Sequence, residues 1–320
     1  MYSSSNITAI TDVPALVSTF AATAGWTVTG AAGSPILTHP TLPGAISFQL
    51  TAAVVGNDHT LTWTASGAPV VTSNALITSP KMNGTLAAPD VSLPSKVHLF
   101  GDLLPEPFLA IVVEYGFNLY RHLYFGYVEK LSAFTGGECI AGSGFGDRSD
   151  LQPQYRGGFT YYLFDALQAG RAAATAGGVR VDHASNATKW RRFATPTSVQ
   201  AALTMTTDTA LGGFQDDINS GYLARGKSTY AGTNILVPMT LYAVKQGGNP
   251  PILAPIGAPA GVRMIHIQDI DPGAEFIVGT KTWKAFAAFR KNASTFSTVK
   301  PAGWNTDETS LWVGYAYPKD

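Results

Sequence analysis

The clearest pattern of apolar and polar residues lies near the middle of the chain. Residues 108–113 form an unbroken apolar run rich in β-branched side chains and too short for a typical helix, which predicts a strand buried on both faces. Residues 119–126 alternate instead, with even-numbered side chains on one face and odd-numbered ones on the other. Turn-forming residues at 114–118 and 135–137 precede the second segment and a short strand at 138–141. The pattern predicts a three-stranded meander at the core of the fold.

One helix is predicted near the N-terminus. Thr11 or Asp12 has the side chain of an N-cap, and Pro14 suits the first turn that follows. Apolar residues then recur at helical spacing until Gly25, which ends the segment. We therefore expect a helix that begins near residue 12 and ends near residue 24.

Shorter segments predict further strands along the chain. They lie at residues 26–29, 45–50, 60–65, 97–100, 179–181, 235–244, 263–270, 275–278, 283–289 and 311–317. The sequence Asp271-Pro272-Gly273 predicts a tight turn that pairs 263–270 with 275–278 as a hairpin. The Pro- and Gly-rich residues 67–96 and 247–261 predict a loop and an extended linker, and residues 159–169 predict a short helix.

These elements predict a mainly β fold of antiparallel sheets, with meanders and sandwich-like packing, a few short helices and long Pro/Gly-rich loops. We expect an N-terminal β domain at 1–185 that contains the leading helix and the central meander. A second β region at 186–320 would contain an extended arm at 195–260 and a C-terminal sheet.

Composition narrows the class of function. The 21 basic and 21 acidic residues give no net charge, which argues against a nucleic-acid or membrane-surface binder. Only 13% of residues are charged, below the ~25% usual for soluble domains, and this suits a surface covered by neighbours in an assembly. The single cysteine, Cys139, excludes an intrachain disulfide. No signal peptide or membrane-spanning run is evident, so we expect synthesis in the cytoplasm.

Two glycine-rich segments resemble nucleotide-binding loops. Residues 221–229 match the pattern G-x4-G-K-[ST], and residues 142–146 read Gly-Ser-Gly-Phe-Gly. A phosphate-binding loop needs a buried strand before it and a helix after it, and neither segment has that context. We interpret the first as a chance match and the second as a turn at the end of a strand.

Other reactive residues also lack a complete constellation. Cys139 with His122 and a glutamate could form a thiol-protease site, but its apolar surroundings favour a core cysteine. The six histidines lack zinc-ligand spacing, and the acidic pairs at 216–217 and 269–271 favour solvated turns. The sequence therefore predicts no catalytic residue, metal site or cofactor.

One motif resembles a known group of proteins. Tyr120-Arg121-His122-Leu123-Tyr124-Phe125-Gly126, followed by Glu129-Lys130 and Thr135-Gly136-Gly137-Glu138, is similar to a stretch in structural proteins of tailed bacteriophages. Gly25-Trp26 after a short helix, and 283–291 before a terminal strand at 311–316, are similar as well. The group often has Phe-Pro in the segment 283–291, whereas here Ala287 and Ala288 follow Phe286. The resemblance covers about half of the chain, in scattered blocks, and leaves 195–260 unmatched.

The resemblance implies a virion component, in the tail or baseplate. We expect such a component to bind itself in a ring of three- or six-fold symmetry and to contact other tail or baseplate proteins. Aromatic and basic residues are the candidate subunit-interface residues, because arginine stacks on aromatic rings and pairs through a rigid fork of donors. They are Tyr120, Arg121, His122, Tyr124, Trp190, Arg191 and Arg192. The alternatives are a head-to-tail or capsid-decorating protein, and a carbohydrate-binding receptor-recognition protein.

Overall fold

The structure is a computed structural model, and it describes most of the chain in separate stretches. The described residues are 1–39, 47–55, 58–66, 73–78, 94–102, 106–115, 119–131, 133–142, 144–145, 159–160, 177–183, 186–193, 210–212, 236–245, 252–267, 270–287 and 313–320.

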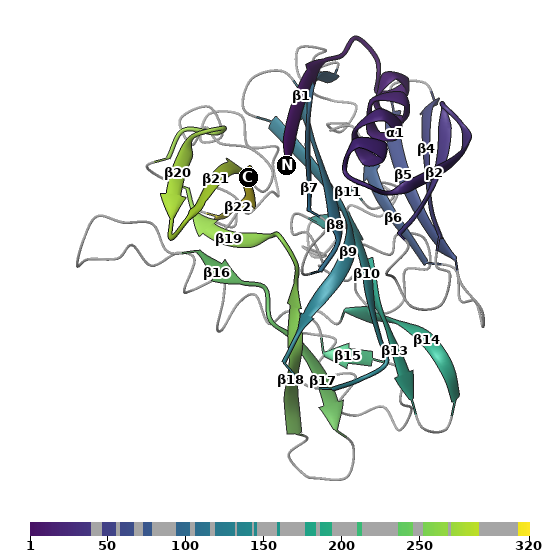
Figure 1. Cartoon of the computed structure of the whole chain (residues 1–320), viewed down its shortest axis with the longest axis vertical. Helices are drawn as coiled ribbons and strands as arrows, with labels where there is room; N and C mark the ends of the chain where they lie inside the picture. Colours follow the sequence, from purple (N-terminus) through teal and green to yellow (C-terminus); the bar gives the residue numbers. More distant parts are fainter. Residues whose placement is uncertain are drawn as a thin grey trace, which may run out of the picture.

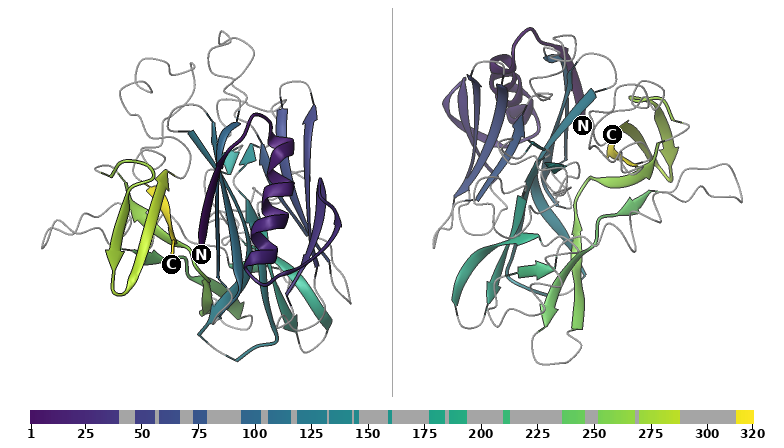
Figure 2. Two further views of the ribbon diagram at one scale, coloured as in Figure 1. Left: turned by 45° about the horizontal axis from the view of Figure 1, so that its top comes forward. Right: turned by 180° about the vertical axis from the view of Figure 1, so that it is seen from behind.

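The fold is mainly β, as the sequence predicts, and its antiparallel sheets are stacked in layers. A ten-stranded sheet forms the centre, and a five-stranded sheet lies on each side of it (Figures 1 and 2). The strand order in the central sheet is β1-β7-β8-β9-β10-β13-β14-β15-β17-β18, and β18 also pairs with β9. The flanking sheets have the orders β2-β3-β4-β5-β6 and β16-β19-β22-β21-β20.

The predicted meander is confirmed as the middle of the central sheet. It consists of β8 (Phe108–Tyr115), β9 (Leu119–Lys130) and β10 (Gly136–Gly142), each antiparallel to the next. Gly136 and Gly137 have φ of 101° and 108°, a backbone conformation that favours glycine, so the predicted turn residues do start β10.

The remaining strands extend the three sheets. The central sheet also contains β1 (Tyr2–Asn6), β7 (Pro94–Asp102), β13 (Gly177–His183), β14 (Asn186–Phe193), β15 (Ala210–Gly212), β17 (Leu241–Lys245) and β18 (Ile252–Pro259). The N-terminal flanking sheet contains β2 (Thr27–Ala31), β3 (Ser34–Thr38), β4 (Ser47–Val55), β5 (Asp58–Ser66) and β6 (Ser73–Thr78). The C-terminal sheet contains β16 (Val237–Pro238), β19 (Arg263–His266), β20 (Glu275–Val278), β21 (Lys281–Ala287) and β22 (Val313–Pro318). A separate pair joins β11 (Gly144–Phe145) to β12 (Phe159–Thr160).

The predicted helix is α1 (Val13–Thr23), with a proline in its first turn and Gly25 just beyond its end at φ 84°. The cap was predicted less well. The Asp12 carboxylate accepts hydrogen bonds from the N–H groups of Thr8 and Ala9, at 3.1 and 3.0 Å, so it caps the short 3-10 turn before α1 instead of α1 itself.

Two predictions about the second half of the chain are wrong. Residues 247–261 are not simply a linker, because β18 forms there and pairs with both β17 and β9. Gly257 permits this pairing, since a Cβ at that position would lie 2.4 Å from Glu129 O. The hairpin predicted across 271–273 is also wrong, because β19 pairs with β16 and β22, whereas β20 pairs with β21. The Gly273 N–H instead donates to Ala285 O at 2.6 Å, which leads the chain to the outer side of β21.

Several other predicted elements lie only partly within the described residues. The loop predicted at 67–96 contains β6, and of the helix predicted at 159–169 the structure describes residues 159–160, which are strand. The predicted domain boundary at 185 falls between β13 and β14, which pair with each other. The division into two domains stays a prediction.

The two faces of β8 explain why the molecule has three layers. Phe108, Ala110 and Val112 belong to the hydrophobic cluster shared with the C-terminal sheet. Side chains at the intervening positions, Leu109 and Ile111 among them, belong to the cluster shared with α1 and the N-terminal sheet. Each face is therefore fully buried against a different partner, as the unbroken apolar run predicts.

The cluster under α1 is centred on aromatic rings that Phe125 holds together. Its ring lies 4.9, 4.4 and 4.5 Å from the rings of Trp26, Phe48 and Trp63, which come from the N-terminal layer. Such offset and edge contacts add to the free energy that burial alone provides. Phe125 thus links the central sheet to the layer that covers it.

Replacing Phe125 with Ala should lower the free energy of unfolding by about 3–5 kcal/mol, because it removes a fully buried ring and leaves a cavity. Chemical denaturation of the purified chain measures this change. Val54→Ala, at a position that is 49% exposed, is the matched control and should change stability by no more than about 0.5 kcal/mol. Equal effects of the two substitutions would show that Phe125 does not join the layers.

Candidate functional site

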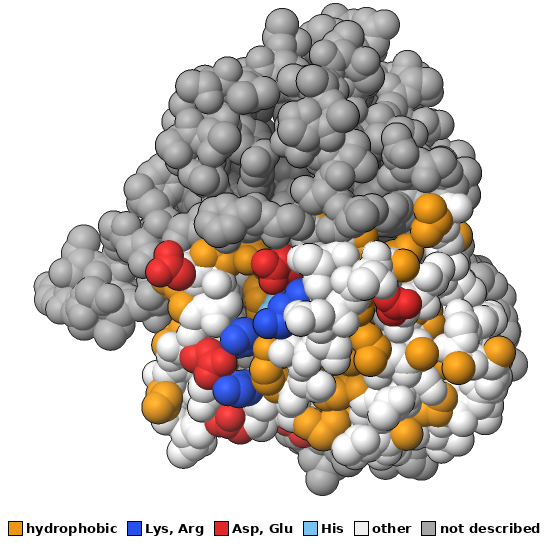
Figure 3. Space-filling view, turned by 90° about the horizontal axis from the view of Figure 1, so that it is seen from above, with side chains coloured by type: hydrophobic (Ala, Val, Ile, Leu, Met, Phe, Trp, Pro, Cys, Tyr) orange, Lys and Arg blue, Asp and Glu red, His pale blue; other side chains and the backbone are white. Residues whose placement is uncertain are grey.

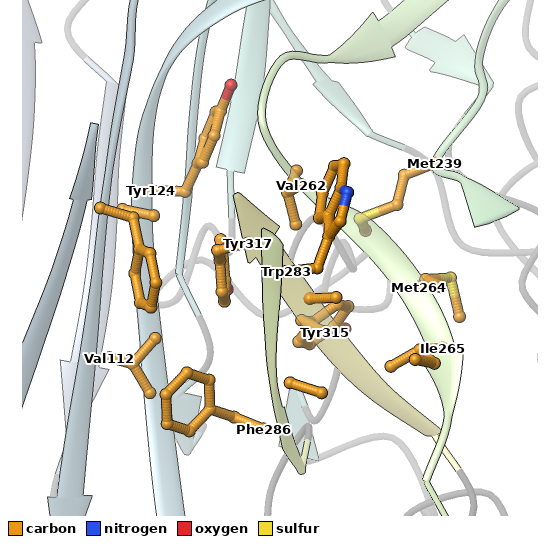
Figure 4. Close-up of a cluster of buried hydrophobic side chains, with 14 of the residues drawn as sticks. Val112, Tyr124, Met239, Val262, Met264, Ile265, Trp283, Phe286, Tyr315 and Tyr317 are labelled. Atoms are coloured by element: carbon orange, nitrogen blue, oxygen red, sulfur yellow. The ribbon is translucent and has the colours of Figure 1, made fainter. Parts of the chain in front are cut away.

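The motif residues on β9 lie inside the molecule. Tyr120 and Arg121 are 3% and 1% exposed, and His122 and Tyr124 are fully buried. Tyr120 and Tyr124 belong to the cluster between the central and C-terminal sheets, and Figure 4 shows Tyr124 in this cluster together with Tyr317 and Phe286. These four residues therefore pack within their own chain, and their predicted role between subunits stays a prediction.

His122 joins the central sheet to two strands of the C-terminal sheet. Its Nε2 lies 2.8 Å from Ala287 O, and because a carbonyl only accepts, this nitrogen donates. Its Nδ1 lies 2.9 Å from the hydroxyl of Tyr317 and therefore accepts from it. Complete burial lowers the pKa of His122 to about 3, so the ring is neutral and its tautomer is set by these two bonds.

Cys139 is a core residue, as the sequence predicts. It is fully buried, and this burial raises the pKa of its thiol above the ordinary value. Its neighbour Tyr124 donates a hydrogen bond from its hydroxyl to Ala260 O at 2.9 Å, which ties β9 to the turn after β18. A protonated, enclosed thiol is a poor nucleophile, so this pair contributes to packing.

Of the arginines predicted to lie at a subunit interface, the structure describes the side chain of Arg121 but not those of Arg191 and Arg192. Arg121 donates from Nη1 to Tyr120 O at 3.0 Å within the core. Trp190, Arg191 and Arg192 lie on β14, whose backbone pairs with β13, but their side chains lie outside the described part of the chain. Their predicted role at a subunit interface is therefore still a prediction.

An ion pair that the sequence did not suggest links the central sheet to the C-terminal sheet. Arg263 on β19 donates from Nη2 to both carboxylate oxygens of Glu129 on β9, at 3.0 and 2.8 Å. The guanidinium also lies 5.9 Å from the ring of Trp283. The sequence predicts a strand at 263–270 but holds no information about the partner of Arg263, which lies 134 residues earlier.

The two termini lie close together (Figure 1), and a small group of paired charges lies beside them. Glu275 accepts hydrogen bonds from Lys284 and Lys319, both at 2.9 Å, and these bonds lower the pKa of its carboxyl group. Both ammonium groups also lie near the ring of Tyr2, at 5.3 and 5.7 Å. Figure 3 shows acidic and basic side chains next to each other on this part of the described surface.

The exposed apolar side chains single out one strand. Four large apolar side chains are exposed among the described residues, and two of them, Ile277 (75%) and Val278 (43%), are adjacent on β20. The others, Val54 and Leu131, stand singly in the sequence. β20 is the last strand of the C-terminal sheet and pairs with β21 on its inner side. We call the outer side of residues 275–278 the β20 edge.

No group of three or more metal-ligating side chains occurs among the described residues. Within the same part of the chain, no helix is long and apolar enough to cross a membrane. The glycine-rich segment 221–229 and the acidic pair at 216–217 lie outside the described residues. Residues 144–145 of the other glycine-rich segment form β11, a short strand.

No protein-family model matches this chain, and no curated protein is significantly similar to it in sequence. The β20 edge is the candidate functional site, because no described strand pairs with it and it carries adjacent exposed apolar side chains, which together make a binding surface.

The burial of His122 predicts a loss of stability in acid. Its pKa is about 3 in the folded chain and ordinarily 6.5, so the unfolded chain binds the proton more readily below pH 6.5. Stability is thus fully present above pH 6.5 and falls toward pH 3, by up to about 1.4 kcal/mol per pH unit. Denaturation measured across this range tests the effect.

His122→Gln is the control, since an amide does not titrate. Its stability should vary less steeply with pH, and the remaining slope should come from other groups such as His98 and His39, whose pKa values burial also lowers. An unchanged slope in the variant would contradict the assignment to His122.

Proposed function

We propose that this chain is a structural component of a tailed-bacteriophage virion, in the tail or baseplate, that acts by binding copies of itself and neighbouring virion proteins. The observation that carries the binding role is the β20 edge, where apolar side chains are exposed on a strand that pairs, among the described residues, with β21 on one side alone. The virion setting rests on the resemblance of 120–138 to phage structural proteins.

The contacts of the described histidine, cysteine and charged side chains support a binding role over a catalytic one. His122 holds two sheets together as a neutral ring, and Cys139 is enclosed with a raised thiol pKa. Arg263 and Glu129 are occupied with each other. These groups maintain the fold, and the protein acts through its surface.

The low charge content supports an assembled state. With only 13% charged residues, much of the surface is uncharged, and such surfaces are suited to lie against other proteins. We propose a ring of three- or six-fold symmetry, since closed symmetric assemblies are the usual form of homo-oligomers. A head-to-tail or capsid-decorating position is the alternative within the same class.

The carbohydrate-binding alternative receives less support. Sugar recognition relies on exposed aromatic rings, but the tryptophans whose side chains the structure describes, Trp26, Trp63 and Trp283, are 3%, 0% and 8% exposed. Each is committed to a hydrophobic cluster.

Quantitative mass spectrometry of density-purified particles from the producing host tests the proposed function. We expect the chain to be present in a copy number that is a small multiple of three or six. A copy number in the hundreds would favour decoration or a tail tube instead.

Absence of the chain from intact particles would overturn the virion proposal. As a control, Lys227→Ala in the segment that matches a phosphate-binding loop should leave particle assembly unchanged. Loss of an ATP-dependent step in that variant would favour an enzyme.

A further inference from the structure

The β20 edge has backbone groups positioned to pair with another strand. Ala274 O accepts a hydrogen bond from Ala285 N at 3.1 Å, so the even-numbered residues of this segment direct their backbone groups toward β21. The N–H and C=O groups of the odd-numbered residues Glu275 and Ile277 consequently point outward. β20 contains no proline or lysine, the residues that commonly block pairing at an edge.

The side chains of this segment match themselves when two copies run antiparallel. With Phe276 on a two-fold axis, Glu275 of each copy lies opposite Ile277 of the other, and each such pair exchanges its outward N–H···O=C bonds. Ala274, Phe276 and Val278 share the other face. Val278 then lies opposite Ala274 of the second copy, and Phe276 lies opposite its own equivalent. One face of the joined strands is therefore apolar along its length.

The charge on the strand does not oppose this contact. Glu275 is the one charged residue of β20, and it is bonded to Lys284 and Lys319 of its own chain. Its carboxylate is thus neutralised before a second copy approaches. Ile277 of the second copy would lie across from this group and exchange its 75% exposure for contact.

Other sheet ends with described side chains are poorer partners for β20. β1 presents Ser3, Ser4 and Ser5, and β2 is mostly Thr, Gly and Ala. β16 is two residues long and contains Pro238, which has no N–H to donate. An apolar strand edge gains most from an apolar partner, and β20 itself is the one described edge with that character.

We propose that β20 joins two copies of this chain by antiparallel strand pairing about a two-fold axis centred on Phe276, so that two C-terminal sheets become continuous. The inference deepens the proposed function, on which it rests, by naming a second copy of the chain as the partner of this edge. A two-fold contact does not close a ring, so it would join two rings or two neighbouring subunits of one assembly.

Light scattering coupled to size-exclusion chromatography of the purified full-length chain tests the contact. Ile277→Lys places a charge in it, and Ile277→Pro removes an outward N–H that the β20–β21 pairing does not use. Both variants should have half the molar mass of the wild-type particle in solution, because they break its two-fold contact. Their circular dichroism spectra should be unchanged. Val54→Lys, at another exposed apolar position, on β4, should keep the wild-type mass.

Cysteine crosslinking tests the register. Residues that face each other at a non-hydrogen-bonded position have Cα atoms about 4.5 Å apart, which suits a disulfide. Phe276→Cys should therefore give a covalent dimer under mild oxidation, whereas Ile277→Cys, which faces Glu275, should give much less. The native Cys139 is buried and does not interfere.

Three outcomes would overturn this inference. They are a wild-type chain that is monomeric at all concentrations, a mass that does not respond to either Ile277 variant, and crosslinking that is equal at 276 and 277. A variant that keeps its mass but loses another virion protein would assign the edge to that protein. None of these outcomes alters the particle copy number, so failure here is distinct from failure of the virion proposal.

Discussion

The structure depends on the burial of β8 on both of its faces. A strand with apolar side chains on one face needs a single covering layer, but residues 108–113 are apolar on both, so the central sheet needs two. Fully burying a side chain such as Leu109 or Ile111 contributes about 1.5–3 kcal/mol relative to leaving it in water. The N-terminal sheet with α1 covers one face, and the C-terminal sheet covers the other.

The second covering layer explains the polar residues found inside. Docking the C-terminal sheet removes His122 and Tyr317 from water, and each then needs a hydrogen-bond partner within the protein. The histidine satisfies both ring nitrogens as a neutral group, which costs far less than burying a charge. Arg263 and Glu129 lie nearer the surface and remain paired at the margin of the same contact. The polar side chains His122, Arg263 and Glu129 therefore serve to join the central sheet to the C-terminal sheet.

A molecule built from stacked sheets binds most naturally at the strands that end them. Among its described edges, β1 and β2 carry small polar residues and β16 carries a proline, features that discourage pairing. The β20 edge lacks such protection and presents Ile277 and Val278 to solvent. This contrast between protected and unprotected edges locates the proposed assembly function on one strand of the C-terminal sheet.

The sequence by itself determined the local elements: α1, the meander of β8, β9 and β10, and the mainly β class all follow from side-chain periodicity and turn residues, which act over a few positions. Tertiary structure alone decided how distant segments pair. β1, the sheet position of β18 and the separation of β19 from β20 depend on contacts far apart in sequence, such as Gly257 against Glu129. The same limit applies to the site. Composition and pattern singled out Tyr120–Tyr124, but their enclosure by the C-terminal sheet, and the exposure of Ile277, follow from the positions that the strands take in the folded sheets.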